Sequence, residues 1–165
     1  MKITWYRQGQ GDRQPYKVSP ITCVEDVVEV SDFLFEGYGQ LREGLKLTWD
    51  EFLSELLRVA KAGLTTAITA VFFSKSGKPL GYIILMDETL GSVERVAHIY
   101  AAYSNGLYRG IADEAIRFAE EWAKQNGFNK LQATSRRMSG AAMKLFKKRL
   151  KFRPVYVVFE KGLNE

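Results

Sequence analysis

The residues that could do chemistry surround a glycine-containing loop that leads into a strongly periodic helix, over 104–127. A helix N-terminus presents unpaired N–H groups and the positive end of the helix dipole, and small residues let a phosphate approach that backbone. Asn105, Gly106, Gly110 and Ala112 meet this steric demand. Glycines between a strand and a helix also serve as simple turns, so the spacing alone leaves a phosphate site and a plain turn both open.

Two groups that could accept a proton stand on the strand before this loop. Strand alternation predicts that Glu94, His98, Tyr100 and Ala102 share one face, so that Glu94 and His98 border the same cleft. An imidazole titrates near neutral pH, which suits it to take a proton from an ammonium group directly or through water. The alternative is a histidine that is hydrogen-bonded within the sheet, with Glu94 as a solvated charge at a strand end.

Positive charge gathers in the last third of the chain. Residues 122–159 contain no Asp or Glu, although the whole chain has a net charge of only +5. Such a field attracts anions, among them nucleic acid, a membrane surface or the phosphates of a cofactor, and a solvated basic face is the simpler alternative. The ten basic residues of this stretch are Lys124, Lys130, Arg136, Arg137, Lys144, Lys147, Lys148, Arg149, Lys151 and Arg153.

The composition is that of one ordinary globular domain of 165 residues, with 46% hydrophobic and 26% charged residues. Cys23 is the single cysteine and His98 the single histidine, so we expect neither an internal disulfide nor a metal site. No apolar run reaches the roughly 18 residues that span a bilayer, and the first residues lack the apolar core of a secretory signal. We therefore expect a cytoplasmic protein without a membrane partner.

The helices that must position this chemistry can be read from their apolar periodicity. The segment 23–41 has the pattern of a helix that is interrupted near Gly37 and Gly39. Residues 48–51, Thr-Trp-Asp-Glu, form a capping-box pattern at the start of a second helix, which ends at Gly63. These two helices precede most of the predicted strands.

The rest of the chain alternates strands with two further helices. A turn at 75–78 joins two strands into a hairpin, the helix after the glycine-containing loop ends at Gly127, and a last helix is predicted over 139–150. A strand-helix-strand unit beside a hairpin is typical of a mixed α/β sheet. Strands are predicted over 3–7, 16–21, 65–74, 80–87, 93–103, 130–135 and 151–160.

The loop matches neither the Walker motif, which needs Gly-Lys-Ser/Thr, nor the dinucleotide fingerprint, whose glycines are spaced differently. Residues 110–127, GIADEAIRFAEEWAKQNG, instead resemble the acetyl-CoA-binding segment of the GNAT superfamily of N-acetyltransferases. In that family Arg/Gln-x-x-Gly-x-Gly/Ala precedes a helix that a glycine closes at this distance. Residues 131–135 and 142–154 are similar to the later strand and helix of the family, and the order of elements matches over roughly 16–160.

The resemblance implies an α/β (α+β) fold with a mixed, mostly antiparallel central sheet that is flanked by helices on both faces. It implies a single acyltransferase domain over 1–165, of which 1–20 is a divergent N-terminal strand region. It also implies an N-acetyltransferase that moves an acetyl group from acetyl-CoA, as cosubstrate, to an amine of a small molecule or protein by direct attack.

The roles of individual residues follow from the same resemblance. Backbone N–H groups of 107–112, assisted by Arg109, would hold the pyrophosphate, and the strand segment 99–102 would splay from its neighbour, bind the pantetheine arm and polarise the thioester carbonyl. His98, Glu94 and Tyr156 are the expected catalytic residues. The expected cofactor-binding residues are Tyr100, Ala101, Ala102, Leu107, Tyr108, Arg109, Gly110, Ile111, Ala112, Ser139 and Phe146.

The chain departs from the family pattern at four positions. Leu107 stands where Arg or Gln is expected, Ser139 where an asparagine commonly opens the next helix, and Lys151 where a glycine precedes Phe-x-Pro. Phe146 aligns with the tyrosine that often protonates the departing thiolate, and a phenylalanine has no proton to give. Water or one of three tyrosines could replace that donor: Tyr103, Tyr108 or Tyr156.

The acceptor and the wider partners stay open. The family walls its acceptor cleft with the first helices and the final strands, which here would offer Phe35, Tyr38 and Trp49, although aromatic residues at helical spacing are also common in cores. A homodimer is left open, and nucleic acid is not expected because no recognised nucleic-acid-binding motif is present. The two alternatives are a catalytically degenerate GNAT-fold binding or structural protein, of phage or mobile-element origin, and a nucleic-acid-binding domain that uses the basic third.

Overall fold

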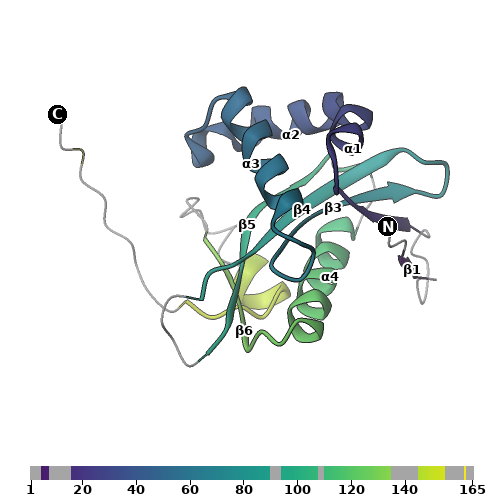
Figure 1. Ribbon diagram of the computed structural model, residues 1–165. Coiled ribbons are helices and arrows are strands. Elements are labelled where there is room, and N and C mark those ends of the chain that lie inside the picture. The colour runs from purple at the N-terminus through teal and green to yellow at the C-terminus, as the bar shows by residue number, and fades with distance from the viewer. Residues whose placement is uncertain are drawn as a thin grey trace. The chain divides into compact units, whose positions relative to one another are not determined.

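A six-stranded sheet runs through the first of the two units into which the chain divides, Met1–Thr134 and Ser135–Glu165 (Figure 1). The computed structural model describes residues 5–7, 16–89, 94–107, 110–134, 145–154 and 162. The strands lie in chain order, and all neighbours are antiparallel except β5 and β6, which are parallel. The predicted mixed, mostly antiparallel sheet is therefore confirmed. Its strands are β1 (Trp5–Arg7), β2 (Tyr16–Pro20), β3 (Ala67–Ser74), β4 (Pro79–Asp87), β5 (Val96–Ser104) and β6 (Lys130–Ala133).

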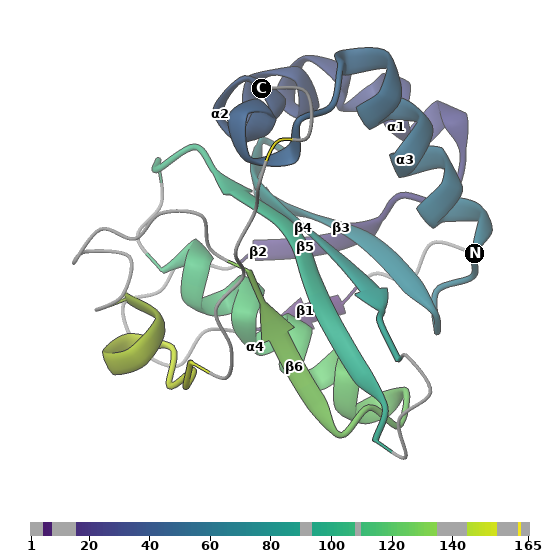
Figure 2. The same cartoon turned by 90° about the vertical axis from the view of Figure 1, so that its left-hand side faces the viewer.

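Helices cover both faces of this sheet, as predicted (Figure 2). One face carries α1 (Val24–Glu29), α2 (Ser31–Leu45) and α3 (Trp49–Lys61), and the other carries α4 (Ile111–Gln125). The first face encloses an apolar core to which α2 and α3 contribute buried side chains such as Leu34 and Leu56, and the sheet contributes Val71 and Ile84. On the second face the rings of Phe118 and Phe72 meet edge to face at 5.8 Å. None of the described helices is both long and apolar enough to cross a membrane.

The start of α3 shows how closely the local sequence directs the fold. The Thr48 hydroxyl accepts the N–H of Glu51 at 3.2 Å, and the Glu51 carboxylate accepts the N–H of Thr48 at 2.7 Å. The two residues form the predicted capping box, which satisfies N–H groups that a helix start otherwise leaves unpaired. The helix ends at Lys61, shortly before Gly63 as predicted.

The predicted interruption near Gly37 and Gly39 is wrong, because α2 continues through both glycines. The break lies earlier, at Val30, between α1 and α2. A Cβ on Gly37 would lie 2.5 Å from the Tyr82 hydroxyl and 2.8 Å from Cδ1 of Tyr103. The glycine therefore lets α2 approach the sheet closely, and it does not end the helix.

The predicted hairpin is present. The Gly77 N–H donates to the Ser74 carbonyl at 2.9 Å, which closes the turn between β3 and β4. The strand predicted over 93–103 begins later, at Val96, because Glu94 and Arg95 form a bend before it. The helix predicted after the loop is α4, and Gly127 follows it in the left-handed conformation.

The second unit holds one turn of π-helix, η1 (Leu145–Arg149). The Phe152 N–H donates to the Phe146 carbonyl at 2.8 Å, and the two rings meet edge to face. Residues 139–144 of the predicted helix lie outside the described residues. The strand predicted over 151–160 is wrong for 151–154, where Lys151 has a φ of 59° and the chain folds back on the helical turn. The remainder of that strand lies outside the described residues, and the single domain over 1–165 stays a prediction.

Candidate functional site

The strand β5 contains a bulge at its centre. Ile84 of β4 pairs with Ala101, while the next residue, Leu85, pairs with Ile99, so that Tyr100 is left without a partner. A bulge inserts one residue into a strand, interrupts the regular ladder and turns the following side chains to the other face. This irregularity lies in the segment 99–102, which the family resemblance assigned to the thioester.

The other edge of β5 loses its partner at the same place. β6 pairs only with the first part of β5, from Val96 opposite Lys130 to Ile99 opposite Ala133. Beyond Ile99, no strand among the described residues pairs with this edge. The edge from Tyr100 to Ser104 is thus open to an extended ligand.

Backbone groups on this open edge have a defined direction. The N–H of Asn105 donates to the Leu80 carbonyl of β4 at 3.1 Å. Successive N–H groups of a strand point to opposite edges, so those of Ser104 and Ala102 alternate with Asn105 and point away from β4. The arrangement offers hydrogen-bond donors to an extended ligand that runs along β5.

The loop after β5 leads into the N-terminus of α4. Gly110 is the N-cap residue, has a φ of 91° and makes no side-chain cap, so the N–H groups of Ile111 and Ala112 receive no cap from it. A Cβ on Gly110 would meet nothing within 4 Å, which means that the left-handed backbone, and not a lack of space, favours glycine here. The helix start can therefore face an anion.

The N–H of Leu107, which was expected to face the pyrophosphate, already has a hydrogen-bond partner. It donates to the Asn105 side chain at 3.1 Å, in a local turn. The side chain of Leu107 is 68% exposed and has no charge to offer. Tyr108 and Arg109 lie outside the described residues, so the structure describes Leu107, Gly110, Ile111 and Ala112 of the predicted cradle.

His98 lies inside the sheet, opposite Met86 of β4 and Gln132 of β6. Its side chain is only 10% exposed, and its Nδ1 atom has no hydrogen-bond partner among the described residues. A carboxylate oxygen of Glu88 lies 3.3 Å from Nδ1 without the alignment of a hydrogen bond. The structure thus differs from the alternative of a histidine that is hydrogen-bonded within the sheet.

The predicted common face of β5 is wrong for two of its four residues. Glu94 precedes the strand, is exposed and forms an ion pair with Lys130. Ala102 pairs with Ile83 and lies on the α4 face, because the bulge at Tyr100 shifts the alternation by one residue. His98 and Tyr100 remain on the face of α2 and α3, to which Ala101 also belongs.

Two tyrosines stand near the bulge on that face. The Tyr103 hydroxyl donates to a Glu36 carboxylate oxygen at 2.7 Å, and burial followed by this carboxylate raises the pKa of Tyr103 to about 12. Burial also raises the pKa of Tyr100 above its ordinary value, and the Glu55 carboxylate adds to this shift. Both phenols are therefore neutral near neutral pH, as a proton donor would have to be.

An aromatic cluster lies at the junction of α2 and α3. Phe35 meets Trp49 edge to face at 5.1 Å, and the Tyr38 ring lies 5.5 Å from Trp49. Tyr38 and Trp49 pack against the core, whereas Phe35 is exposed. Of the three residues proposed to line an acceptor cleft, Phe35 is thus the one that presents its ring to solvent.

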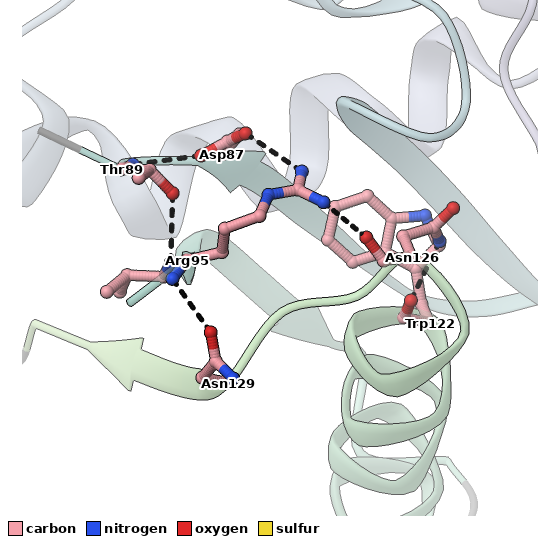
Figure 3. A network of polar contacts seen from close by, with 7 residues as sticks. Asp87, Thr89, Arg95, Trp122, Asn126 and Asn129 are labelled. Atoms are coloured by element: carbon pink, nitrogen blue, oxygen red, sulfur yellow. Dashed lines mark hydrogen bonds and ion pairs between the residues drawn. The ribbon is translucent and has the colours of Figure 1, made fainter. Parts of the chain in front are cut away.

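A network of polar contacts surrounds the start of β5, at the end of the strand opposite the glycine-containing loop (Figure 3). The Arg95 guanidinium donates to the Asn126 carbonyl at 2.6 Å, pairs with Asp87 at 3.2 Å and stands 4.3 Å above the Phe128 ring. The Arg95 N–H donates to the Asn129 side chain at 2.9 Å. These contacts join the end of β4, the start of β5, the end of α4 and the turn before β6.

Sequence reasoning missed Glu88 and Arg95, because their contacts join segments that are distant along the chain. Among the expected site residues, Tyr108, Arg109, Ser139 and Tyr156 lie outside the described residues, and Phe146 belongs to the second unit. No group of three or more metal-ligating side chains is found in the part of the chain that the structure describes.

Solved structures share this fold. An acetyltransferase from Trypanosoma brucei has a TM-score of 0.65 at 22% identity, covering 90% of this chain and 99% of its own. An aminoglycoside antibiotic 6'-N-acetyltransferase from Acinetobacter baumannii has a TM-score of 0.65 at 18% identity, with the same coverage. AAC(6')-Iy, in complex with a bisubstrate analog that contains CoA, has a TM-score of 0.64 at 13% identity, covering 89% of this chain and 97% of its own.

The sequence comparison with curated proteins gives no match. The family model of the acetyltransferase (GNAT) family matches residues 35–152, which is well over half of the chain. This match confirms the predicted class of enzyme, an acetyl-CoA-dependent N-acetyltransferase. The chain therefore belongs to the acetyltransferase (GNAT) family.

Proposed function

We propose that this chain transfers the acetyl group of acetyl-CoA to a primary amine by direct attack of the amine on the thioester. The observation that carries the proposal is the combination of the Tyr100 bulge with the loss of a pairing strand from Tyr100 to Ser104. A bulge beside an open strand edge presents backbone donors to an extended ligand in a way that a regular sheet does not.

Acetyl-CoA would bind in two parts. Its pantetheine arm would lie along the open edge of β5, where the N–H groups of Ala102 and Ser104 point away from β4. Its pyrophosphate would lie at the start of α4, where Gly110 brings no side chain and the helix dipole favours negative charge. The complex of AAC(6')-Iy with a bisubstrate analog that contains CoA supports the binding of CoA by a protein of this fold.

The chemistry needs a neutral amine, a donor for the developing oxyanion and groups that handle protons. Backbone N–H groups near the bulge would stabilise the oxyanion, since fixed donors in a partly dry site need little reorganisation. His98 would accept a proton from the attacking nitrogen, directly or through water. Water or a neutral tyrosine such as Tyr103 would protonate the thiolate, because Phe146 has no proton to give.

The helices that would wall the acceptor cleft favour a cationic amine as acceptor. Residues 24–61, which form α1 to α3, contain nine acidic and four basic residues. An acidic surface raises the local concentration of positively charged substrates. The name of the similar structure from Acinetobacter baumannii, an aminoglycoside acetyltransferase, agrees with polycationic amines as the first acceptors to try.

Two measurements test the proposal. Calorimetric titration should show that acetyl-CoA binds the chain, and release of free thiol should follow the addition of an amine from a panel of aminoglycosides, polyamines and lysine peptides. Binding without thiol release for any amine would favour the degenerate GNAT-fold binding protein, to which the Leu107 and Phe146 substitutions already point. No binding of acetyl-CoA or CoA at millimolar concentration would refute the proposed function.

A further inference from the structure

A buried histidine with an unsatisfied ring nitrogen needs an explanation. His98 is 8% exposed, and its Nδ1 atom is one of three buried side-chain polar atoms without a hydrogen-bond partner among the described residues. Leaving such an atom unpaired costs roughly 1–3 kcal/mol, so native proteins retain few of them. The other two are the hydroxyls of Thr69 and Tyr82.

Glu88 provides the charge that His98 faces. Its carboxylate lies 3.3 Å from Nδ1, while its side chain is half exposed. Its backbone is fixed, since the Glu88 N–H donates to the Val96 carbonyl at 2.9 Å and the adjacent Thr89 hydroxyl accepts the Val96 N–H at 3.0 Å. The carboxylate can therefore move by a side-chain rotation alone to make the missing bond.

We propose that Glu88 is a positioning residue that accepts the Nδ1–H of His98 and so leaves Nε2 free to accept the proton of the amine. This inference rests on the proposed function. As the amine nitrogen bonds to the thioester carbon, Nε2 takes one proton from that nitrogen, and the C–S bond then breaks with its electron pair leaving on sulfur. Glu88 stays ionised and stabilises the imidazolium that forms.

Two other charged groups near this part of the sheet, Arg58 and Lys130, are each paired with a carboxylate among the described residues. Arg58 of α3 reaches to 4.0 Å from the sulfur of Met86, the cross-strand neighbour of His98, but its guanidinium is bonded to Glu55. At the start of β5, Lys130 is paired with Glu94. Tyr100, two residues after His98, is neutral near neutral pH because its pKa is raised. Glu88 is thus the charged group in contact with the ring among the described residues.

The experiment uses the fact that His98 is the single histidine of the chain. In an untagged, ¹⁵N-labelled chain, the ring nitrogen shifts report the tautomer of this one imidazole without overlap. We expect a neutral ring protonated at Nδ1, and a redistribution towards Nε2–H in Glu88→Ala, which removes the acceptor. The control is Glu120→Ala, which removes an exposed carboxylate from α4 and should leave the ring signals unchanged.

Kinetics of acetyl transfer give the second readout. Glu88→Gln should lower kcat roughly tenfold, with the KM for acetyl-CoA unchanged. This is less than the roughly 100- to 10,000-fold that general acid–base catalysis contributes, because His98 itself remains. Glu88→Asp, which keeps the charge, should restore part of the rate.

Each outcome decides the matter. A tautomer that does not change in Glu88→Ala overturns the proposal. A tautomer that changes in Glu88→Ala while kcat in Glu88→Gln does not change also overturns it, since Glu88 would then form a structural ion pair only. A wild-type chain that acetylates no amine refutes the proposed function, and this inference with it. Acetyl transfer with an unaltered kcat in Glu88→Gln refutes only the role of Glu88.

Discussion

The two ends of β5 belong to one strand but differ in the strands that pair with them. From Val96 to Ile99 the strand is paired on both edges, and the Arg95 network joins this end to β4, α4 and the turn before β6. From Tyr100 to Ser104 the strand is paired with β4 alone among the described residues, and it leads into a loop that Gly110 ends in a left-handed conformation. The bulge at Tyr100 is the boundary between them.

This difference indicates that one end of the strand holds side chains in place and the other end binds ligand. The closed end satisfies its backbone groups internally and so holds its position, which is the condition for placing a side chain such as His98 accurately. Among the described residues, the open end has no strand to bond its outward N–H groups, and leaving such groups unbonded is costly unless water or a ligand binds them. We therefore expect changes at the open end to alter ligand binding, and changes at the closed end to alter stability and rate.

The largest effect is expected at the open end. Gly110→Glu places a negative side chain at the start of α4, where the pyrophosphate would bind, and should weaken acetyl-CoA binding at least about 100-fold, or about 3 kcal/mol. Gly110→Asn is the matched control, since asparagine tolerates a left-handed backbone and brings no charge. Calorimetry measures both affinities, and circular dichroism checks the fold. Unchanged affinity in a folded Gly110→Glu would show that the loop is only a turn.

The next largest effect is expected at the closed end. Arg95→Ala removes two side-chain hydrogen bonds or ion pairs and the contact with the Phe128 ring, and should lower the free energy of unfolding by about 2–3 kcal/mol. Arg58→Ala is the control, because its main partner is Glu55 three residues earlier on the surface of the same helix, and this pair should matter by less than about 0.5 kcal/mol. Urea unfolding measures both. Equal effects of the two variants would mean that the network adds nothing beyond a surface ion pair.

A pair of glycines tests how the helical layer fits over the open end. Gly37→Ala would push a methyl group against the rings of Tyr82 and Tyr103, and should cost about 1–3 kcal/mol of stability. Gly39→Ala, two residues later in the same helix, has nothing within 4 Å and should stabilise the protein by about 0.5–1 kcal/mol. Opposite signs in thermal unfolding are expected. A neutral Gly37→Ala would contradict the close approach of α2 to the sheet.

The smallest effect concerns alkaline pH. The pKa of Tyr103 is raised to about 12 in the folded protein, above the ordinary value of about 10 for an unfolded tyrosine. The stability that this residue contributes is present below pH 10 and is lost as the pH rises towards 12, because only the unfolded state releases the proton in that window. Tyr103→Phe should therefore lose less stability than the wild type between pH 9 and pH 11 in urea unfolding. The same loss in both proteins would contradict the assigned shift.

Local sequence patterns predicted the elements that local interactions form. The capping box at Thr48, the hairpin turn at Gly77 and the helix that Gly127 follows were all predictable, because each depends on residues a few positions apart. The class of sheet followed from the order of these elements. The family match then confirmed the GNAT resemblance that the sequence of the loop and its helix had indicated.

Features that depend on tertiary contacts were not predictable in this way. In the sequence, Gly37 has the pattern of a helix break. The structure shows that it is a glycine because a Cβ there would collide with Tyr82 and Tyr103. The bulge at Tyr100 has no signature in the sequence, yet it moved Ala102 to the opposite face and so invalidated a prediction made from simple alternation. The approach of Glu88 to His98 likewise depends on the pairing of β4 with β5.

The central claim is that acetyl-CoA binds the open end of β5 and the start of α4. Amide hydrogen exchange of the whole chain, with and without saturating acetyl-CoA, tests it residue by residue. We predict strong protection at Ala102, Ser104, Ile111 and Ala112, and little change from Val96 to Ile99, whose amides are already in a paired strand. Two results would contradict the account. One is binding of acetyl-CoA with unchanged exchange at the four amides predicted to be protected, and the other is binding with equal protection along all of β5.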